Sequence, residues 1–205
     1  SKVSPVEADL VMPVPESGTP AAIGYAEASG IPFKQGMMKN AYVGRTFIQP
    51  SDTLRQLGLR LKLNPVREVI EGKKLVVVDD SIVRGNTQRK LIRMLREAGA
   101  AEVHVRIASP PVKWPCFYGI DFASPGELIA NHGRTDNDEA VAESIRTMVG
   151  ADSLAFVPID DMIAASNQPK ENLCAACFTG DYPLGLPEGN PNADLVRHIQ
   201  KGAEA

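Results

Sequence analysis

The sequence predicts an α/β fold in which helices cover both faces of a mostly parallel central sheet. Short apolar runs alternate with amphipathic segments along most of the chain, and strands that are separated by helices usually pair in parallel. One run, KLVVVDD at 74–80, is almost continuously β-branched, which is typical of a strand buried on both faces. A chain of 205 residues, 43% of them hydrophobic, is also large enough for one substantial core.

The expected elements follow one another from the N-terminus. A strand at 8–14 leads into a helix at 20–30, with Pro20 near its first turn and Gly30 just past its end. After the strand at 74–80, the segment 86–100 has helical spacing, with Asn86 as N-cap and Gly99 as its stop. The remaining elements are a strand at 101–109, an amphipathic helix at 136–150 and a strand at 153–159.

Two regions interrupt this alternation. Residues 39–74 are polar and basic, and so long an excursion before a core strand is more often a functional lid than an idle loop. Residues 166–192 are rich in proline and carry the string LCAACF, so we expect them to wrap the surface as an irregular tail. The predicted organisation is a body at 1–165 and a tail at 166–205 that contains a C-x-x-C pair.

Composition excludes several classes of protein. The net charge of −3 argues against wholesale binding of nucleic acid. No apolar run approaches the roughly 20 residues that cross a bilayer, and the first residues do not form a secretory signal. Three cysteines cannot all pair within one chain, which favours a reducing compartment. We therefore expect a cytoplasmic protein.

Two adjacent aspartates mark the candidate site. Asp79 and Asp80 end a predicted parallel strand, and ligands of such sheets bind beyond the carboxyl ends of the strands. The following loop, 81–87, leads into a helix N-terminus, which is a ready anion site. Carboxylates suit hydroxyl groups and Mg²⁺, so the pattern indicates a sugar phosphate. An isolated aspartate pair is more often a turn cap, but the strand before it and the helix after it favour a ligand site. The loop is not a Walker P-loop, because G-K-[ST] is missing.

The string around these aspartates resembles the phosphoribosyl pyrophosphate signature of type I phosphoribosyltransferases. Further blocks are similar, in order, to glutamine phosphoribosylpyrophosphate amidotransferases of the iron–sulfur branch: VPESGTPAAIGYAEASGIPF, MKNAYVGRTFIQP, REAGAAEVHVRIASPP, CFYGID, ELIA and CAACFTGDYP. An insertion such as NHGRTDND differs from that pattern. The resemblance implies a type I phosphoribosyltransferase fold and the first step of purine synthesis. In that step, ammonia released from glutamine attacks the anomeric carbon of phosphoribosyl pyrophosphate to give 5-phosphoribosylamine and pyrophosphate.

The resemblance also assigns roles to residues. It implies that Asp79 and Asp80 bind the ribose hydroxyls and Mg²⁺, with an oxygen of Ser17 as a further metal ligand. Lys39 and Arg45 would contact pyrophosphate, although solvated surface charge explains them about equally well without the resemblance. The basic stretch at about 45–69 would be a flexible loop that closes over the substrate. The other implied contacts are Glu16, Gly18 and Thr19 at the pyrophosphate, and Ser81, Val83, Arg84, Gly85, Asn86 and Thr87 at the 5′-phosphate, where Asn86 replaces the expected threonine.

The cysteines allow several interpretations. Cys174 and Cys177 form the C-x-x-C pair and Cys116 lies far away in the sequence, so free thiols, a redox pair or a zinc site all fit. The resemblance implies a [4Fe–4S] cluster, which requires four thiolates, so the fourth would lie upstream of this chain. The family's glutaminase domain begins with a cysteine nucleophile, whereas residue 1 here is Ser1. We therefore expect a part of a larger protein that uses ammonia but not glutamine.

Partners follow from the same resemblance. It implies phosphoribosyl pyrophosphate and ammonia as substrates, purine nucleotides as feedback inhibitors, a glutaminase domain of the same protein and a homo-oligomer, with no nucleic acid or membrane. Two other functions stay open. A nucleobase phosphoribosyltransferase of salvage would share the aspartate loop but has no need of the CAACF block. A non-catalytic phosphoribosyl pyrophosphate-binding regulator would carry a DNA-binding module, and none is visible.

Overall fold

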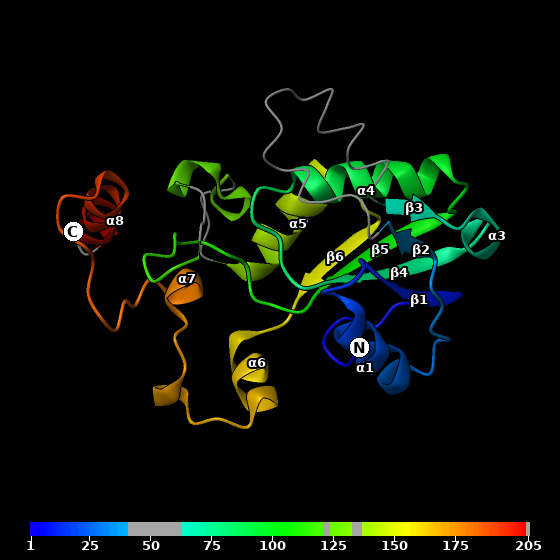
Figure 1. Cartoon of the computed structure of the whole chain (residues 1–205), viewed down its shortest axis with the longest axis horizontal. Coiled ribbons are helices and arrows are strands. Elements are labelled where there is room, and N and C mark those ends of the chain that lie inside the picture. Colours follow the sequence, from blue (N-terminus) through cyan, green and yellow to red (C-terminus); the bar gives the residue numbers. More distant parts are fainter. Residues whose placement is uncertain (41–62, 121–123, 133–136, 204–205) are drawn as a thin grey trace.

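A four-stranded parallel sheet forms the centre of the molecule. The computed structural model describes residues 1–40, 63–120, 124–132 and 137–203. The sheet has the order β1-β4-β5-β6, with every neighbouring pair parallel, as the alternating sequence pattern predicts (Figure 1). Its strands are β1 (Leu10–Pro13), β4 (Lys74–Asp79), β5 (Glu102–Ile107) and β6 (Ser153–Phe156).

Helices cover both faces of this sheet, which confirms the predicted layers. Helix α1 (Thr19–Ser29) packs on one face, and α4 (Asn86–Glu97) and α5 (Asp138–Val149) pack on the other (Figure 1). Successive side chains of β4 point to opposite faces, so Val76 and Val78 meet α1 while Leu75 and Val77 join the larger core. This two-sided burial explains why β4 reads as a continuous apolar run. The larger core also contains Leu91, Ile92, Leu95, Ile145 and Val149 from the two helices.

The helix ends are fixed by a few residues. Gly30 ends α1 at φ 74°, and Pro20 lies in its first turn, as predicted. The predicted N-cap Asn86 is wrong: Gly85 caps α4 at φ 72°, and Asn86 is the first helical residue. The residue just before α4 has a positive φ. Glycine adopts this conformation at little cost, and asparagine adopts it less readily.

Several short elements lie outside the predicted pattern. An antiparallel pair, β2 (Met37–Lys39) and β3 (Leu63–Pro65), and the single-turn helix α3 (Arg67–Ile70) lie within the region read as a lid. Most of the loop expected at 45–69 falls outside the described residues, and its last part belongs to β3 and α3. The last strand ends at Phe156, because Pro158 caps a further helix, α6 (Ile159–Ser166).

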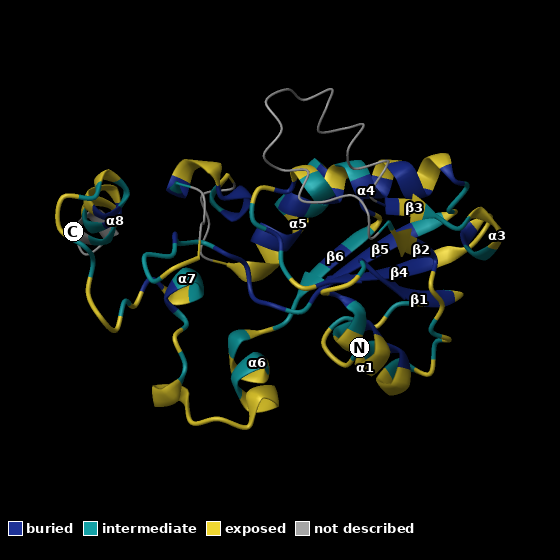
Figure 2. Ribbon diagram, viewed as in Figure 1, coloured by how far each residue is buried: buried dark blue, intermediate teal, exposed yellow. Residues whose placement is uncertain are grey.

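The C-terminal part has short helices joined by irregular chain. These are the 3₁₀ turn η4 (Lys170–Asn172), α7 (Ala176–Thr179) and α8 (Pro191–Ala203). Figure 2 shows α6 and the segment that follows it as half-buried or exposed, in contrast to the buried sheet. Two more 3₁₀ turns, η2 (Pro125–Glu127) and η3 (Ile129–Asn131), precede α5. No described helix is both long and apolar enough to cross a membrane.

Candidate active site at the carboxyl edge of the sheet

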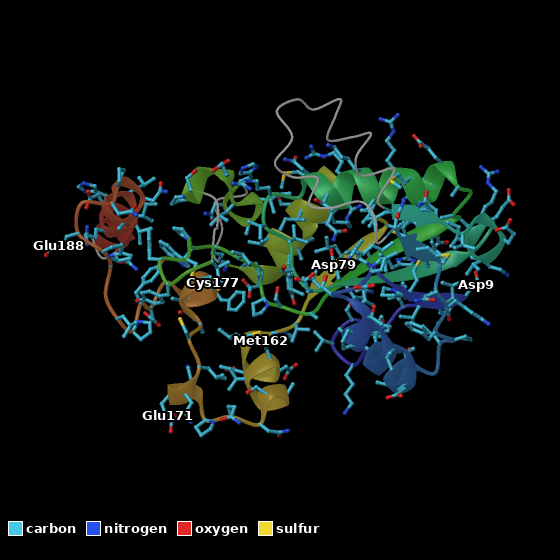
Figure 3. The ribbon with its side chains drawn as sticks, viewed as in Figure 1. Asp9, Asp79, Met162, Glu171, Cys177 and Glu188 are labelled. Atoms are coloured by element: carbon cyan, nitrogen blue, oxygen red, sulfur yellow. The ribbon has the colours of Figure 1, made fainter. Side chains whose placement is uncertain are left out.

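Two loops that are distant in the sequence meet beyond β1 and β4. Because these strands are parallel neighbours, their carboxyl ends lie at the same edge of the sheet. The hydroxyl of Ser17, in the loop after β1, donates a hydrogen bond of 2.8 Å to Oδ1 of Asp80, which follows β4. Figure 3 shows Asp79 at this end of β4. The structure thus joins the segment predicted to hold pyrophosphate to the aspartate pair predicted to hold ribose.

Gly18 permits this close approach. A Cβ atom at residue 18 would lie 2.3 Å from the carbonyl oxygen of Val78 and 3.1 Å from Cα of Asp79. Real Cβ atoms do not come so near to backbone atoms, so any larger residue would push the first loop away from β4. Gly18 also caps α1, and its carbonyl accepts from the N–H of Ala22 at 2.9 Å. The peptide bond between Pro15 and Glu16, in the same loop, is cis.

The two aspartates have different surroundings. Asp79 is 7% exposed, and burial, reinforced by the neighbouring Asp80 carboxylate, raises the pKa of Asp79 to about 8. Asp80 is more exposed and accepts hydrogen bonds from the hydroxyls of Ser17 at 2.8 Å and Ser81 at 2.9 Å. Partial burial opposes its ionisation, but hydrogen bonds from Asp79, Ser17 and Ser81 outweigh that effect and lower the pKa of Asp80. The accessible carboxylate is therefore Asp80.

The loop between Asp80 and α4 is supported by η2 and η3. The N–H of Ile129 donates to the carbonyl of Val83 at 2.9 Å, and Arg84 pairs with Glu127 at 3.4 Å. A Cβ at Gly85 would lie 2.3 Å from Cδ1 of Ile129, so the Ile129 side chain would have to move, and the φ of 72° at Gly85 independently favours glycine. The loop ends in the first turn of α4, where the first N–H groups of a helix lack intrahelical partners. Residues 81–87 thus form a supported loop that can bind an anion.

Of the two basic residues predicted to contact pyrophosphate, Lys39 lies in the described part of the chain and Arg45 does not. Lys39, at the end of β2, places its Nζ 3.4 Å from Oε2 of Glu16, so it lies beside the loop predicted to hold pyrophosphate. Arg45 lies outside the described residues. The supporting segment 124–132 contributes Glu127 and Ile129, which the sequence did not single out as site residues. The only sign of this segment in the sequence was the short ELIA block of the family resemblance. Its 3₁₀ turns are too short to show a periodic pattern of apolar residues.

The oxygen donors at this edge suit a hard cation. Ser17, Asp79 and Asp80 offer one hydroxyl and two carboxyl groups, which are all oxygen ligands. Among the described residues, no three His, Cys, Asp or Glu side chains are arranged to hold a metal ion. Mg²⁺ is commonly held by one or two carboxylates together with substrate phosphates and water, so this donor set is compatible with it.

The cysteine region is separate from the carboxylate site. Figure 3 shows Cys177 on α7, well away from Asp79. The carbonyl of Cys177 accepts from the N–H groups of Lys113 at 3.1 Å and Trp114 at 3.0 Å, which brings α7 against the segment containing Cys116. Burial, with smaller effects from the Cys116 and Cys174 thiols, raises the pKa of Cys177 to about 11. The three thiols therefore share one neighbourhood, without forming a ligand set for a single ion in the part described.

Comparison with known proteins agrees with this geometry. The family model described as "Phosphoribosyl transferase domain" matches residues 6–109, which include both loops and the aspartate pair. This chain belongs to the phosphoribosyltransferase family. The matched range ends before the cysteines and before β6, so family membership rests on β1, β4 and β5 and the loops at their carboxyl ends.

The similar full-length proteins are amidophosphoribosyltransferases, which confirms the resemblance seen in the sequence. The chain is 69% identical over 200 residues to the enzyme of Mycobacterium tuberculosis, covering 97% of this chain and 38% of that protein. It is 53% identical over 196 residues to the enzyme of a Synechocystis species, covering 96% and 38%. The glutamine phosphoribosylpyrophosphate amidotransferase of B. subtilis, solved in complex with ADP and GMP, superposes with a TM-score of 0.75 at 53% identity, covering 89% and 39%. The chain thus spans less than two fifths of the length of these relatives.

Proposed function

We propose that this chain transfers ammonia to phosphoribosyl pyrophosphate, giving 5-phosphoribosylamine and pyrophosphate, as part of an amidophosphoribosyltransferase. The hydrogen bond between Ser17 and Asp80 carries the proposal, because it joins the loops for the two ends of one substrate. A phosphoribosyl group with its 5′-phosphate on residues 81–87 would extend past Asp79 and Asp80 toward the loop at 16–19. Similarity to amidophosphoribosyltransferases over 97% of the chain supports the choice of ammonia as acceptor.

The chemistry requires stabilisation of a charged leaving group. As pyrophosphate leaves, the ribose becomes electron-poor and negative charge grows on the departing oxygens. Lys39 would bind that charge, and a Mg²⁺ held by Ser17, Asp79 and Asp80 would supply further positive charge there. Ammonia is already a nucleophile, so the site needs no strong base. Asp79 and Asp80 would also hold the ribose hydroxyls and so fix the anomeric carbon relative to ammonia.

Purine nucleotides are the proposed inhibitors of this site. A nucleoside 5′-monophosphate shares its ribose 5-phosphate with phosphoribosyl pyrophosphate, so it would occupy residues 81–87 and the aspartate pair and compete with the substrate. The structure of the B. subtilis relative, which contains ADP and GMP, supports this proposal. To test this, the binding of phosphoribosyl pyrophosphate is measured at increasing GMP concentrations. We expect GMP to compete with the substrate.

The proposed role of the cysteines is to hold a [4Fe–4S] cluster. Cys116, Cys174 and Cys177 would be three of its thiolates, and the fourth would come from protein outside this chain. Support comes from the backbone hydrogen bonds that bring α7 against residues 113–114. When bound, the cluster would cross-link the tail to the body. Iron and sulfide analysis of the anaerobically purified full-length protein tests this, and zinc in place of iron would contradict it.

Product analysis tests the proposed reaction. The chain is incubated with phosphoribosyl pyrophosphate and Mg²⁺, and with ammonia, glutamine or a purine base in separate reactions. We expect pyrophosphate and phosphoribosylamine with ammonia, and no release of glutamate from glutamine, which we assign to the part of the relatives that this chain does not cover. Turnover only with a base would indicate a salvage enzyme. Binding of phosphoribosyl pyrophosphate with no turnover in any reaction would favour a regulator.

A further inference from the structure

A buried glutamine connects the aspartate pair to the beginning of α4. Gln88 lies in the first turn of α4, only 2% exposed, although glutamine is usually a surface residue. Its Nε2 donates a hydrogen bond to Oδ2 of Asp79. The side chain therefore links the helix that ends the phosphate-binding loop to the carboxylate at the end of β4.

With this contact, both side-chain oxygens of Asp79 accept a hydrogen bond. Oδ1 of Asp79 accepts from the N–H of Asp80 at 2.9 Å, and Oδ2 accepts from Gln88. With a donor on each oxygen, the carboxylate plane has little freedom to rotate. Asp80 is held differently, by the hydroxyls of Ser17 and Ser81, which can rotate or be displaced by a bound ligand. Gln88 thus helps to set the orientation of the buried aspartate, beside the contact between the Asp79 and Asp80 carboxyl groups.

Burying the polar side chain of Gln88 costs free energy, so packing alone does not explain why glutamine occupies this position. Its Oε1 is buried and has no hydrogen-bond partner in the described part of the chain. A buried polar atom in this state is unfavourable, whereas a methionine or leucine would fill the same space without it. The next core residues of α4, Leu91 and Ile92, are indeed apolar. The polar side chain at 88 is therefore best explained by its donor to Asp79.

We propose that Gln88 is a positioning residue for phosphoribosyl pyrophosphate, acting through Asp79. It keeps the Asp79 carboxylate aligned with the ribose and Mg²⁺ while the 5′-phosphate lies on the loop that leads into its own helix. The inference rests on the proposed function and adds a residue that the sequence did not single out. The loss of Gln88 should weaken substrate binding and turnover more than it weakens the fold.

Gln88→Met tests this, because methionine keeps the volume and removes the donor. A matched control is Met94→Leu, another volume-conserving change at a buried position of the same helix. The measurements are the thermal midpoint, the dissociation constant for phosphoribosyl pyrophosphate with Mg²⁺ by calorimetry, and kcat and KM with ammonia. We expect Gln88→Met to melt near the parent and to bind the substrate about tenfold more weakly, with a lower kcat. Met94→Leu should bind and turn over like the parent.

A double-mutant cycle with Asp79→Asn identifies the route of the effect. If Gln88 acts through Asp79, Gln88→Met will change binding much less in the Asp79→Asn background than in the parent. If Gln88→Met does not fold, Gln88→Asn, which keeps the amide but is too short for the same contact, replaces it in the cycle. Additive effects, or a folded Gln88 variant that binds within twofold of the parent, would overturn the proposal. A parent chain that does not bind phosphoribosyl pyrophosphate at all would overturn the proposed function as well, which distinguishes the two failures.

Discussion

At the scale of single residues, the site depends on where each oxygen is held. Asp79 is buried and fixed by an N–H and an amide, whereas Asp80 is reachable and held by two serine hydroxyls. The sequence placed both aspartates at the carboxyl end of a strand, because a β-branched run followed by two acids is a local pattern. It did not reveal which aspartate is buried, since that depends on Gln88 and on the opposing loop at Ser17, which are brought near by the fold.

Asp80→Asn should reduce turnover with ammonia by about 100-fold or more, because the accessible carboxylate is lost where the charge of the leaving group is balanced. The steady-state rate of pyrophosphate release measures this. Asp161→Asn, an exposed position in α6, is the matched control and should behave like the parent. A rate for Asp80→Asn within a few-fold of the parent would contradict the assigned role.

Two glycines of the same region should respond oppositely to alanine. Gly18→Ala places a Cβ 2.3 Å from the carbonyl oxygen of Val78, so we expect a lower thermal midpoint and weaker binding of phosphoribosyl pyrophosphate. A Cβ atom at Gly24, within α1, would meet nothing within 4 Å, and alanine there should stabilise the helix by up to about 1 kcal/mol. Thermal unfolding and calorimetry on both variants test this. Equal effects of the two changes would show that the approach of the loop to β4 is not required.

At the scale of elements, the strongest local patterns determined what could be predicted. The buried run of β4 and the glycine after α1 are local signals, and both agree with the structure. The pair β2–β3 has only three residues in each strand, too few to show an alternating pattern. The first residue of α4 was misassigned because asparagine is a common N-cap, while the turn itself needed the positive φ of Gly85. Contacts between distant segments decided the rest.

Asp152, in the turn between α5 and β6, links α4 to β5 and provides a test at the scale of elements. Oδ2 of Asp152 accepts from the N–H of Val103 at 2.6 Å and from Arg96 at 2.8 Å. Burial opposes ionisation of Asp152, but these two groups outweigh it and hold the pKa of Asp152 below its ordinary 3.8. Its contribution to stability is therefore present above about pH 3.8 and is lost as the pH falls through the folded-state pKa.

Asp152→Asn should consequently lower the free energy of unfolding at pH 7 by about 0.5–1 kcal/mol, since charge-assisted hydrogen bonds at a solvent-exposed carboxylate are replaced by neutral ones. The difference from the parent should shrink as the pH is lowered below 3.8. Urea unfolding of both proteins at several pH values measures it. If the difference in free energy of unfolding between the parent and Asp152→Asn grew toward acid pH, the assigned role of the ionised Asp152 would be wrong.

At the scale of the whole molecule, the tail is fastened to the body by polar contacts of aromatic residues. The hydroxyl of Tyr182 donates to the carbonyl of Pro115 at 2.7 Å, and that of Tyr118 donates to the carbonyl of Gly185 at 3.0 Å. Tyr182 also packs against Phe117 and Tyr118. These contacts hold the segment of Cys177 beside that of Cys116. An irregular tail was predictable from its prolines, but its partner segment was not, because no periodic pattern connects residues 113–118 to 177–185.

Thiol reactivity tests the placement of the tail. Cys174 is exposed, whereas burial raises the pKa of Cys177 to about 11 and leaves little of the reactive thiolate at pH 8. Iodoacetamide should therefore modify Cys174 faster than Cys177, as followed by peptide mass spectrometry. In denaturant, the two cysteines should react at similar rates. Equal rates in the native chain would contradict the position assigned to Cys177.

We propose that the loops after β1 and β4 form one site for phosphoribosyl pyrophosphate and Mg²⁺. Calorimetric titration of the chain with phosphoribosyl pyrophosphate, with and without Mg²⁺, tests it most directly. We predict one binding site per chain, with an affinity for phosphoribosyl pyrophosphate that Mg²⁺ increases. Asp80→Asn in one loop and Gly18→Ala in the other should each lower that affinity. Binding that is indifferent to Mg²⁺ and to both substitutions, or no binding by the folded parent chain, would contradict it.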